Sequence, residues 1–240
     1  MVNPFDSGII SFLNHFARRS WALDTLFVLS SSYLVRVAGI VPLYWWAWFR
    51  EGEGKTEKRD ILVFGMISSI VALVISRLFS HLLPYRPRPM QNPALHFVVP
   101  YGQSSDILLG WSSFPSDHAA AYFAVAMCLY FVSKRLGIFA LCWALVVTSL
   151  PRVYLGVHYP TDIIAGAAIG IGVAYLVRSV AVRRFTTGWV MRWYERHPGP
   201  FYALMFLFTL QLATAFESVL LLKDYVEALV RHALGLPHDY

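Results

Sequence analysis

Charged residues are scarce in this sequence: Asp, Glu, Lys and Arg make up 14% of its 240 residues, whereas hydrophobic residues make up 57%. Soluble globular domains carry about 25% charged residues, so this composition excludes an ordinary soluble protein and predicts a membrane protein. Internal repeats, low-complexity tracts and a second domain are also lacking. We therefore expect one integral membrane domain over residues 1–240.

Cysteine is equally rare. The chain has Cys128 and Cys142, and both fall inside apolar stretches. Cysteines in such surroundings are expected to pack as small apolar side chains, and this expectation is favoured over a disulfide or a metal pair.

The N-terminus lacks the order of features that marks a signal peptide. Arg18 and Arg19 follow its apolar stretch instead of preceding it, and no small-residue cleavage site is present, so we expect this segment to stay on the mature protein. Residues 4–17 place apolar side chains at helical spacing, which predicts a helix lying in the membrane interface. An irregular lead-in to the first membrane span is the alternative.

Long apolar stretches predict an all-α fold, a bundle of six transmembrane helices, because about 20 helical residues cross a hydrocarbon core. The third and fourth stretches are short. The polar turn at residues 133–137 separates them and ends in a helix-breaking glycine, which favours two helices over one. The predicted spans are residues 22–49, 61–82, 117–133, 137–151, 160–181 and 201–222.

Basic residues gather in the loops beside the predicted spans, so the net charge of +6 does not indicate a nucleic-acid partner. Six spans place the loops 50–60, 134–135 and 182–200 on one side, together with most of the Lys and Arg residues. Such an excess marks the cytoplasmic side. The termini and the motifs described below are then expected to face outward.

One long segment outside the spans, residues 84–115, is rich in proline and aromatic residues. Long loops in compact proteins tend to be functional. This segment joins the first motif to the second, so we expect it to form the lid or rim of a pocket.

The motif Pro115-Ser116-Asp117-His118 stands directly before an apolar run. It predicts the start of a membrane helix, with Ser116 or Asp117 as N-cap. The unpaired N–H groups and partial positive charge of a helix N-terminus favour a bound anion. From the first turn of this helix, His118 could protonate the leaving oxygen of a phosphate as a general acid.

His158 and Asp162 are four residues apart at the start of another predicted helix, in which Pro160 suits the first position. The two side chains therefore share a face. The carboxylate could accept the Nδ1 proton and leave Nε2 of the ring unprotonated and nucleophilic. Arg88 and Arg152 can each fork onto phosphate oxygens and offset the charge of a phosphoryl group in transfer.

At these positions the chain resembles the type 2 phosphatidic acid phosphatase (PAP2) superfamily, with the pattern Lys-x6-Arg-Pro, Pro-Ser-Gly-His and Ser-Arg-x5-His-x3-Asp. The resemblance covers about residues 60–180, its core motifs lie within residues 77–162, and the third motif is the most specific. The matching residues are Arg88, Pro89, Pro115, Ser116, His118, Arg152, His158 and Asp162.

The resemblance implies a role for each matching residue. His158 would be the nucleophile that forms a phosphohistidine, Asp162 would orient it, and His118 would protonate the leaving group. No metal or other cofactor would be needed. The phosphate would be bound by Arg88, Ser116 and Arg152.

The chain departs from the family pattern at three positions. His81 stands in place of the motif Lys, and it, Arg77 or Arg86 could supply the missing cation. Asp117 replaces Gly beside the phosphate, where its carboxylate is tolerable if it turns away from the anion, and we keep both Asp117 and His81 as candidate phosphate-site residues. Pro151 replaces Ser, which removes a peripheral hydroxyl.

Pro-Ser-Asp-His resembles the branch that acts on undecaprenyl diphosphate, the carrier lipid of bacterial wall synthesis. We therefore expect a lipid phosphatase of the bacterial cell (inner) membrane. Its site would face the periplasm or exterior and convert undecaprenyl diphosphate to undecaprenyl phosphate. Its partners would be this lipid substrate and the surrounding membrane lipids; the sequence gives no oligomeric state.

Several alternatives remain open. The substrate could be phosphatidylglycerol phosphate or phosphatidic acid, or the same site could pass its phosphoryl group to another lipid. A binding or transport protein is disfavoured because acidic pairs along a pore are lacking. A divalent-metal site built from His118, His158 and Asp162 would suit zinc by ligand type.

Overall fold

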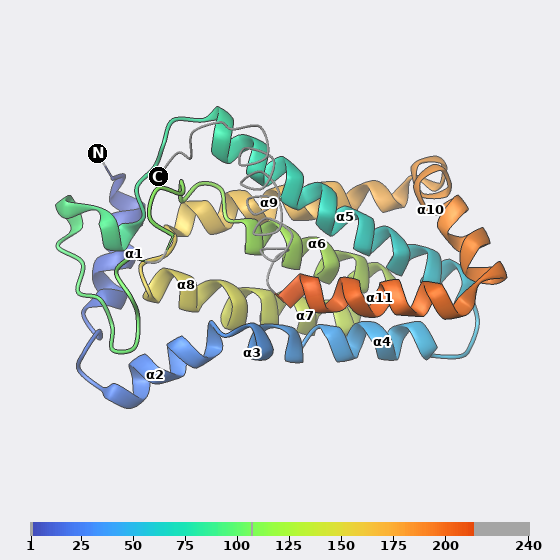
Figure 1. Ribbon diagram of the computed structural model, residues 1–240, viewed down its shortest axis with the longest axis horizontal. Helices are drawn as coiled ribbons and strands as arrows, with labels where there is room; N and C mark the ends of the chain where they lie inside the picture. The colour runs from blue at the N-terminus through green and yellow to red at the C-terminus, as the bar shows by residue number, and fades with distance from the viewer. Residues whose placement is uncertain (1, 107, 214–240) are drawn as a thin grey trace, which may run out of the picture.

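The computed structural model describes residues 2–106 and 108–213, and every regular element in them is a helix, as the all-α prediction requires (Figure 1). Most of the helices run side by side along the long axis of the molecule. The α-helices are α1 (Pro4–Asn14), α2 (Trp21–Ser30), α3 (Tyr33–Ala38), α4 (Val41–Phe49), α5 (Lys55–Leu82), α6 (Asp117–Val132), α7 (Lys134–Trp143), α8 (Leu150–Tyr154), α9 (Pro160–Tyr175), α10 (Val180–Arg196) and α11 (Pro198–Ala213).

Helix α6 forms the centre of the bundle, between α5 and α9. Its side chains are apolar on all faces and mostly buried, as expected of a helix surrounded by others. Close contact with α9 depends on missing side chains, because a Cβ at Gly166 or Gly170 would collide with the carbonyl oxygen of Ser116 or Ala120. The two backbones therefore lie in direct contact. A hydrogen bond from Ser116 N to the carbonyl oxygen of Asp162, at 3.1 Å, connects the starts of the two helices.

Three helices in the described residues are long and apolar enough to cross a membrane: Lys55–Leu82, Lys134–Tyr154 and Pro160–Arg178. The second joins α7 and α8 through a π-helical turn, Ala144–Ser149. Two apolar helices are shorter, Asp117–Val132 and Pro198–Leu212. The chain is thus an integral membrane protein, while the count of six spans stays a prediction. Residues 214–222 of the sixth predicted span lie outside the described residues.

The first predicted span, residues 22–49, is not one straight helix. The helical path bends by 62° between Trp21–Ser30 and Tyr33–Phe49, so it can form at most one broken span. Three consecutive serines, residues 30–32, occupy the bend. Serine hydroxyls compete with helical hydrogen bonds, and Ser30 Oγ donates to the carbonyl oxygen of Leu26 at 2.7 Å. This local competition explains the break.

Residues 182–200 were expected to be a loop, but most of them form α10. Its position depends on Arg183, which pairs with Asp60 at 2.8 Å and with Glu57 at 2.9 Å, both on α5. One of the charges that suggested a solvated loop, that of Arg183, is therefore neutralised across a helix contact. By contrast, the two helices predicted around residue 133 are confirmed as α6 and α7.

The predicted N-terminal helix is present as α1, which ends three residues earlier than expected, at Asn14. Its place in a membrane interface stays a prediction. Helix α1 packs against α8 and α9 at the same end of the bundle as the ends of α5 and α8 and the starts of α6 and α9 (Figure 1). Residues 84–115, which we call the rim segment, extend over this end, whereas α10 lies at the other.

Candidate active site

A cavity of about 400 Å³ opens at the end of the bundle where the sequence motifs meet. Its polar lining includes two histidines and three arginines, drawn from α5, α6, α8, the rim segment and the turn before α9. The rim segment adds apolar side chains, among them Leu108, Leu109 and Trp111. The prediction that this segment borders a pocket is confirmed. The polar lining residues discussed below are Arg77, Arg88, Asp117, His118, Arg152 and His158.

His158 lies buried in this lining, with 4% of its surface exposed. Its Nδ1 is 2.8 Å from the carbonyl oxygen of Ser113 and 3.5 Å from Oδ2 of Asp162. A carbonyl oxygen can only accept, so Nδ1 carries the ring proton and Nε2 holds the lone pair. Burial lowers the pKa of His158 well below its usual range, and the nearby charges of Arg88 and Arg152 lower it further. The ring is therefore neutral at pH 7.

A tight turn places His158 beside Arg152. The backbone N–H groups of Val157 and His158 both donate to the carbonyl oxygen of Arg152, at 2.9 and 3.1 Å. Gly156 makes this turn possible with a φ of +71°, and a Cβ there would collide with Phe97. The spacing of six residues between Arg152 and His158 thus follows from a local turn.

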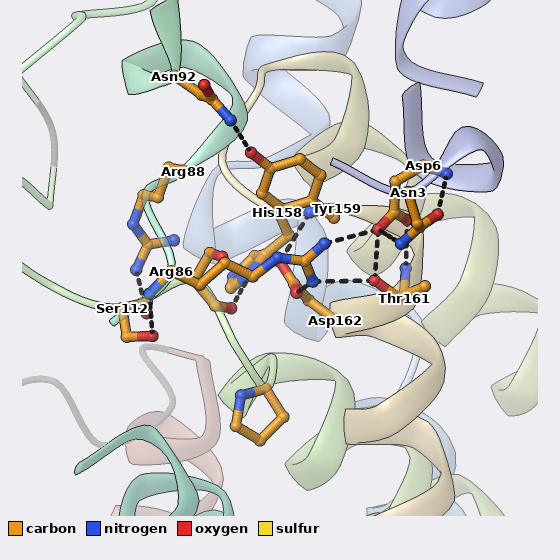
Figure 2. A network of polar contacts seen from close by, with 12 residues as sticks. Asn3, Asp6, Arg86, Arg88, Asn92, Ser112, His158, Tyr159, Thr161 and Asp162 are labelled. Atoms are coloured by element: carbon orange, nitrogen blue, oxygen red, sulfur yellow. Dashed lines mark hydrogen bonds and ion pairs between the residues drawn. The ribbon is translucent and has the colours of Figure 1, made fainter. Parts of the chain in front are cut away.

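Arg88 reaches the cavity from the rim segment. Its Nη1 donates to the carbonyl oxygen of Val157 at 2.8 Å. Its Nη2 donates to the carbonyl oxygen of Ser112 at 3.4 Å (Figure 2). Burial lowers its pKa to about 10, which still leaves the guanidinium charged at pH 7. Arg88 and Arg152 therefore place two cations in the lining of the cavity that also contains His158.

His118 and Ser116 occupy adjacent places at the start of α6 but face different surroundings. His118 is buried and lines the cavity. Ser116 is fully buried, and its Oγ accepts a hydrogen bond from Ala119 N at 3.4 Å as the N-cap of the helix. The cap predicted at Ser116 is confirmed. Its contact with phosphate stays a prediction.

Asp117 lines the cavity with its carboxylate turned toward α5. Its Oδ2 is 2.8 Å from Nε of Arg77, and its Oδ1 accepts a hydrogen bond from Ser76 at 2.8 Å. This pairing neutralises the charge that would otherwise oppose a bound phosphate. Arg77 also lines the cavity and packs over the ring of Trp111, 4.9 Å from its centroid.

His81, the residue in the position of the family Lys, does not line this cavity. It is exposed and borders a neighbouring hollow with Tyr85 and Gly110. Its contact with phosphate stays a prediction. Arg77, one helical turn earlier on α5, lines the cavity itself.

Arg86 also turns away from the cavity. Its Nη1 is 2.5 Å from Oδ1 of Asp162, and its Nη2 is 2.6 Å from Oδ2 of Asp6 (Figure 2). The other oxygen of Asp162 accepts a hydrogen bond from Tyr159 N at 2.7 Å. Arg86 thus pairs with two carboxylates and is not among the residues that line the cavity. Asp162 is held from two sides behind the ring of His158.

Sequence reasoning missed two partners of this site. The carbonyl of Ser113 holds Nδ1 of His158, and Asp6 pairs with Arg86. Nothing in the sequence marks a carbonyl as a ligand, because every residue has one. Asp6 had a weak signal, an acidic residue in the first turn of a helix, but this is also common without any further role.

The alternative of a metal site required His118, His158 and Asp162 to meet. Among the residues that the structure describes, His, Cys, Asp and Glu side chains do not gather in groups of three arranged to hold a metal ion. Instead, Asp162 is engaged by Arg86 and the backbone of Tyr159. The three residue types that would suit zinc are therefore not arranged as a metal site among the described residues.

Comparisons with known proteins agree with the site. The PAP2 superfamily model matches residues 60–186, more than half of the chain. Undecaprenyl-diphosphatase BcrC of Bacillus subtilis (strain 168) is 27% identical over 158 residues, which cover 64% of this chain and 72% of that protein. Lipid A 1-diphosphate synthase of Escherichia coli (strain K12) is 28% identical over 199 residues, 77% of this chain and 80% of that protein.

A solved structure is also similar, that of a transmembrane PAP2 type phosphatidylglycerolphosphate phosphatase from Bacillus subtilis. It is 21% identical, covers 76% of this chain and 80% of its own, and has a TM-score of 0.38. The family assignment depends on the model match and on the three motifs, which the fold brings to one cavity. The chain belongs to the PAP2 superfamily.

Proposed function

We propose that this protein is a membrane lipid phosphatase that removes the terminal phosphate of undecaprenyl diphosphate and releases undecaprenyl phosphate. The observation that carries the proposal is one cavity, at the end of an apolar bundle, lined by His118, His158, Arg88 and Arg152. Its apolar rim suits a substrate that joins a phosphate to a lipid chain. The similarity to a protein named undecaprenyl-diphosphatase supports this choice of lipid.

In the first step, Nε2 of His158 attacks the terminal phosphorus, and the bond from phosphorus to the bridging oxygen breaks. His118, protonated in the substrate complex, gives its proton to that oxygen, so undecaprenyl phosphate leaves and a phosphohistidine remains. Arg88 and Arg152 offset the charge on the transferring group. The carbonyl of Ser113 accepts the hydrogen bond from Nδ1 throughout and keeps Nε2 aimed at phosphorus.

In the second step, water attacks the phosphohistidine. His118 now accepts a proton from the water, the bond from phosphorus to Nε2 breaks, and inorganic phosphate is released. His158 returns to its neutral form with Nδ1 still protonated. Every step is assigned to groups of the protein and to water, so we also propose that hydrolysis needs no metal ion.

Phosphate release from a panel of lipids tests this function. We expect the purified protein to release phosphate fastest from undecaprenyl diphosphate, and more slowly from phosphatidylglycerol phosphate and phosphatidic acid. Excess EDTA should leave the rate unchanged. Loss of activity with EDTA and its return with a divalent metal would contradict the metal-free mechanism, and a preference for phosphatidic acid would reassign the substrate.

A phosphotransferase is the second candidate, because a relative at 28% identity is named Lipid A 1-diphosphate synthase. The phosphohistidine could pass its phosphoryl group to a lipid phosphate instead of water. A radiolabelled terminal phosphate distinguishes the outcomes. Label recovered as inorganic phosphate supports hydrolysis, whereas label recovered on an added acceptor lipid such as lipid A supports transfer.

The acid limb of the pH–rate profile gives a further prediction. His158 must be neutral to attack, and its pKa is lowered from the ordinary 6.5 by burial and by Arg88 and Arg152. The neutral form is complete above the lowered pKa and is lost only as pH falls through it. We therefore expect the acid limb of kcat/KM, corrected for substrate ionisation, to lie below pH 6.5. An acid limb centred above that pH would contradict the assignment of His158.

We further propose that the cavity faces the periplasm or exterior of a bacterial cell membrane. The support is the concentration of Lys and Arg at the opposite end, at the start of α5 and along α10. A cysteine at exposed Ser105 should react with a membrane-impermeant maleimide in intact cells, while one at Arg184 should not. The reverse pattern would overturn the orientation.

A further inference from the structure

Asp6 on α1 is a fully buried carboxylate that the proposed mechanism does not use. Its Oδ1 accepts a hydrogen bond from Thr161 N at 3.0 Å, and its Oδ2 accepts from Thr161 Oγ1 at 2.6 Å. Arg86 Nη2 and Asn3 Nδ2 donate to the same Oδ2 at 2.6 and 2.7 Å. Burial alone would raise the pKa of Asp6, but these hydrogen bonds hold it below its usual value. Asp6 is therefore ionised.

Arg86 connects this carboxylate to the site. One guanidinium spans Asp6 and Asp162, donates to Thr161 Oγ1 at 2.9 Å and stacks 3.9 Å from the ring centroid of Tyr159 (Figure 2). Arg86 lies in the rim segment, whose described residues contain only two short 3-10 turns, Pro89–Gln91 and Pro93–Leu95. Its backbone is tied within the rim segment by hydrogen bonds with Ser112 Oγ at 3.3 Å and Ser113 N at 2.9 Å. The two carboxylates balance the charge of its side chain and fix the direction of the guanidinium.

The chain of contacts ends at the nucleophile. Arg86 and the backbone of Tyr159 fix the two oxygens of Asp162, and Oδ2 of Asp162 lies 3.5 Å from Nδ1 of His158. The carbonyl oxygen of Asp162 also accepts a hydrogen bond from the backbone N–H of Ser116, two residues before His118. A shift of Arg86 would therefore displace the group behind the attacking ring.

We propose that Asp6 is a positioning residue of the phosphatase, acting through Arg86 and Thr161 to hold Asp162 and hence the ring of His158. This inference rests on the proposed function. It makes α1 a part of the site, since a single buried carboxylate on it neutralises the cation that holds Asp162. Arg88 and Arg152, which bind the phosphate in the proposed mechanism, line the cavity, whereas Asp6 lies behind Asp162, so substrate binding should be spared.

Asp24 provides a matched control. It is also fully buried, and it accepts hydrogen bonds from Arg18 N at 3.0 Å, from Tyr101 N at 2.8 Å and from the hydroxyl of Tyr154. It ties α2 to the rim segment at the same end of the molecule. Asp24→Asn therefore removes an equally buried charge without touching the link from Arg86 to Asp162.

The experiment measures kcat, KM and thermal unfolding of purified full-length wild type, Asp6→Asn and Asp24→Asn with the preferred lipid of the panel. We expect Asp6→Asn to lower kcat by about 100-fold, the scale of a displaced reacting group, with KM close to wild type. Asp24→Asn should lower thermal stability to a similar degree and keep kcat close to wild type. Equal losses of kcat in both variants would overturn the proposal and leave Asp6 a structural residue.

A double-mutant cycle tests the route of the effect. Arg86→Gln should lower kcat by itself, and adding Asp6→Asn to it should lower kcat little further, because both act through one contact. Independent, multiplying losses would overturn the link through Arg86. Wild type that releases phosphate from no lipid of the panel would reject the proposed function instead, whereas an active wild type with an equally active Asp6→Asn variant rejects only this inference.

Discussion

Replacing His158 with alanine is expected to abolish phosphate release, with a loss on the order of 10⁶-fold, the scale seen when an enzyme loses its covalent nucleophile. The neutral ring supplies the only lone pair that we assign to attack on phosphorus. The hydrogen bond from its Nδ1 to the carbonyl oxygen of Ser113, at 2.8 Å, fixes the direction of the ring. Alanine at this position has no atom that could attack. Initial rates of phosphate release from undecaprenyl diphosphate measure the effect.

A covalent readout separates loss of the nucleophile from loss of the fold. Substrate labelled in its terminal phosphate should leave label on wild-type protein after an alkaline quench, which preserves phosphohistidine, and none on His158→Ala. His197→Ala, an exposed histidine at the far end of α10, should behave as wild type in both assays. Near-normal hydrolysis by purified, folded His158→Ala protein is the result that this mechanism cannot accommodate.

The residues around the cavity were predictable where the information is local. Arg152 and His158 are six apart because a single turn through Gly156 connects them, and the start of α6 follows from the cap at Ser116. Such spacings can be read from the chain without knowing its fold. The family motifs then meet in one cavity because α5 and α8 end, and α6 and α9 begin, at the same end of the bundle.

What could not be predicted depends on contacts between distant residues. Asp6 and Thr161 are 155 residues apart, and no periodic pattern connects them. Arg77 and Arg86 both flank the first motif, and only the fold shows that Arg77 lines the cavity while Arg86 pairs with carboxylates. Charge type identified the candidates, but the direction of each side chain is set by the elements packed around it.

The helical pattern was predictable in kind but not in detail. Apolar composition identifies α5 and α9 because each contains a long apolar run without an internal proline. The predicted first span is not one straight helix because the path bends at the three serines, residues 30–32, where a hydroxyl bonds to the backbone. Hydropathy does not register such local hydrogen bonding. Likewise, α10 contains many charges, and its contact with α5 depends on ion pairs formed by Arg183.

The second large effect is expected for Arg88. Truncation to alanine should lower kcat/KM by on the order of 10²- to 10³-fold, corresponding to about 3 kcal/mol of transition-state stabilisation from one preorganised donor. Arg88 is 5% exposed, so its charge acts with little screening by water. Arg88→Lys should recover only part of the rate, because an ammonium keeps the charge but cannot fork onto two oxygens. Phosphate release with saturating and limiting lipid separates kcat from KM.

Arg88 also donates to the carbonyl oxygen of Val157, so its loss could act by loosening the turn that carries His158. Inhibition by inorganic phosphate distinguishes the two causes, because it reports binding of the anion without any attack by His158. Lost phosphate contact predicts weaker inhibition in Arg88→Ala, whereas a loosened turn alone predicts unchanged inhibition. Arg19→Ala, an exposed arginine at the same end, controls for the general loss of positive charge. If Arg88→Ala matches Arg19→Ala in rate and inhibition, Arg88 does not bind the transferring phosphate.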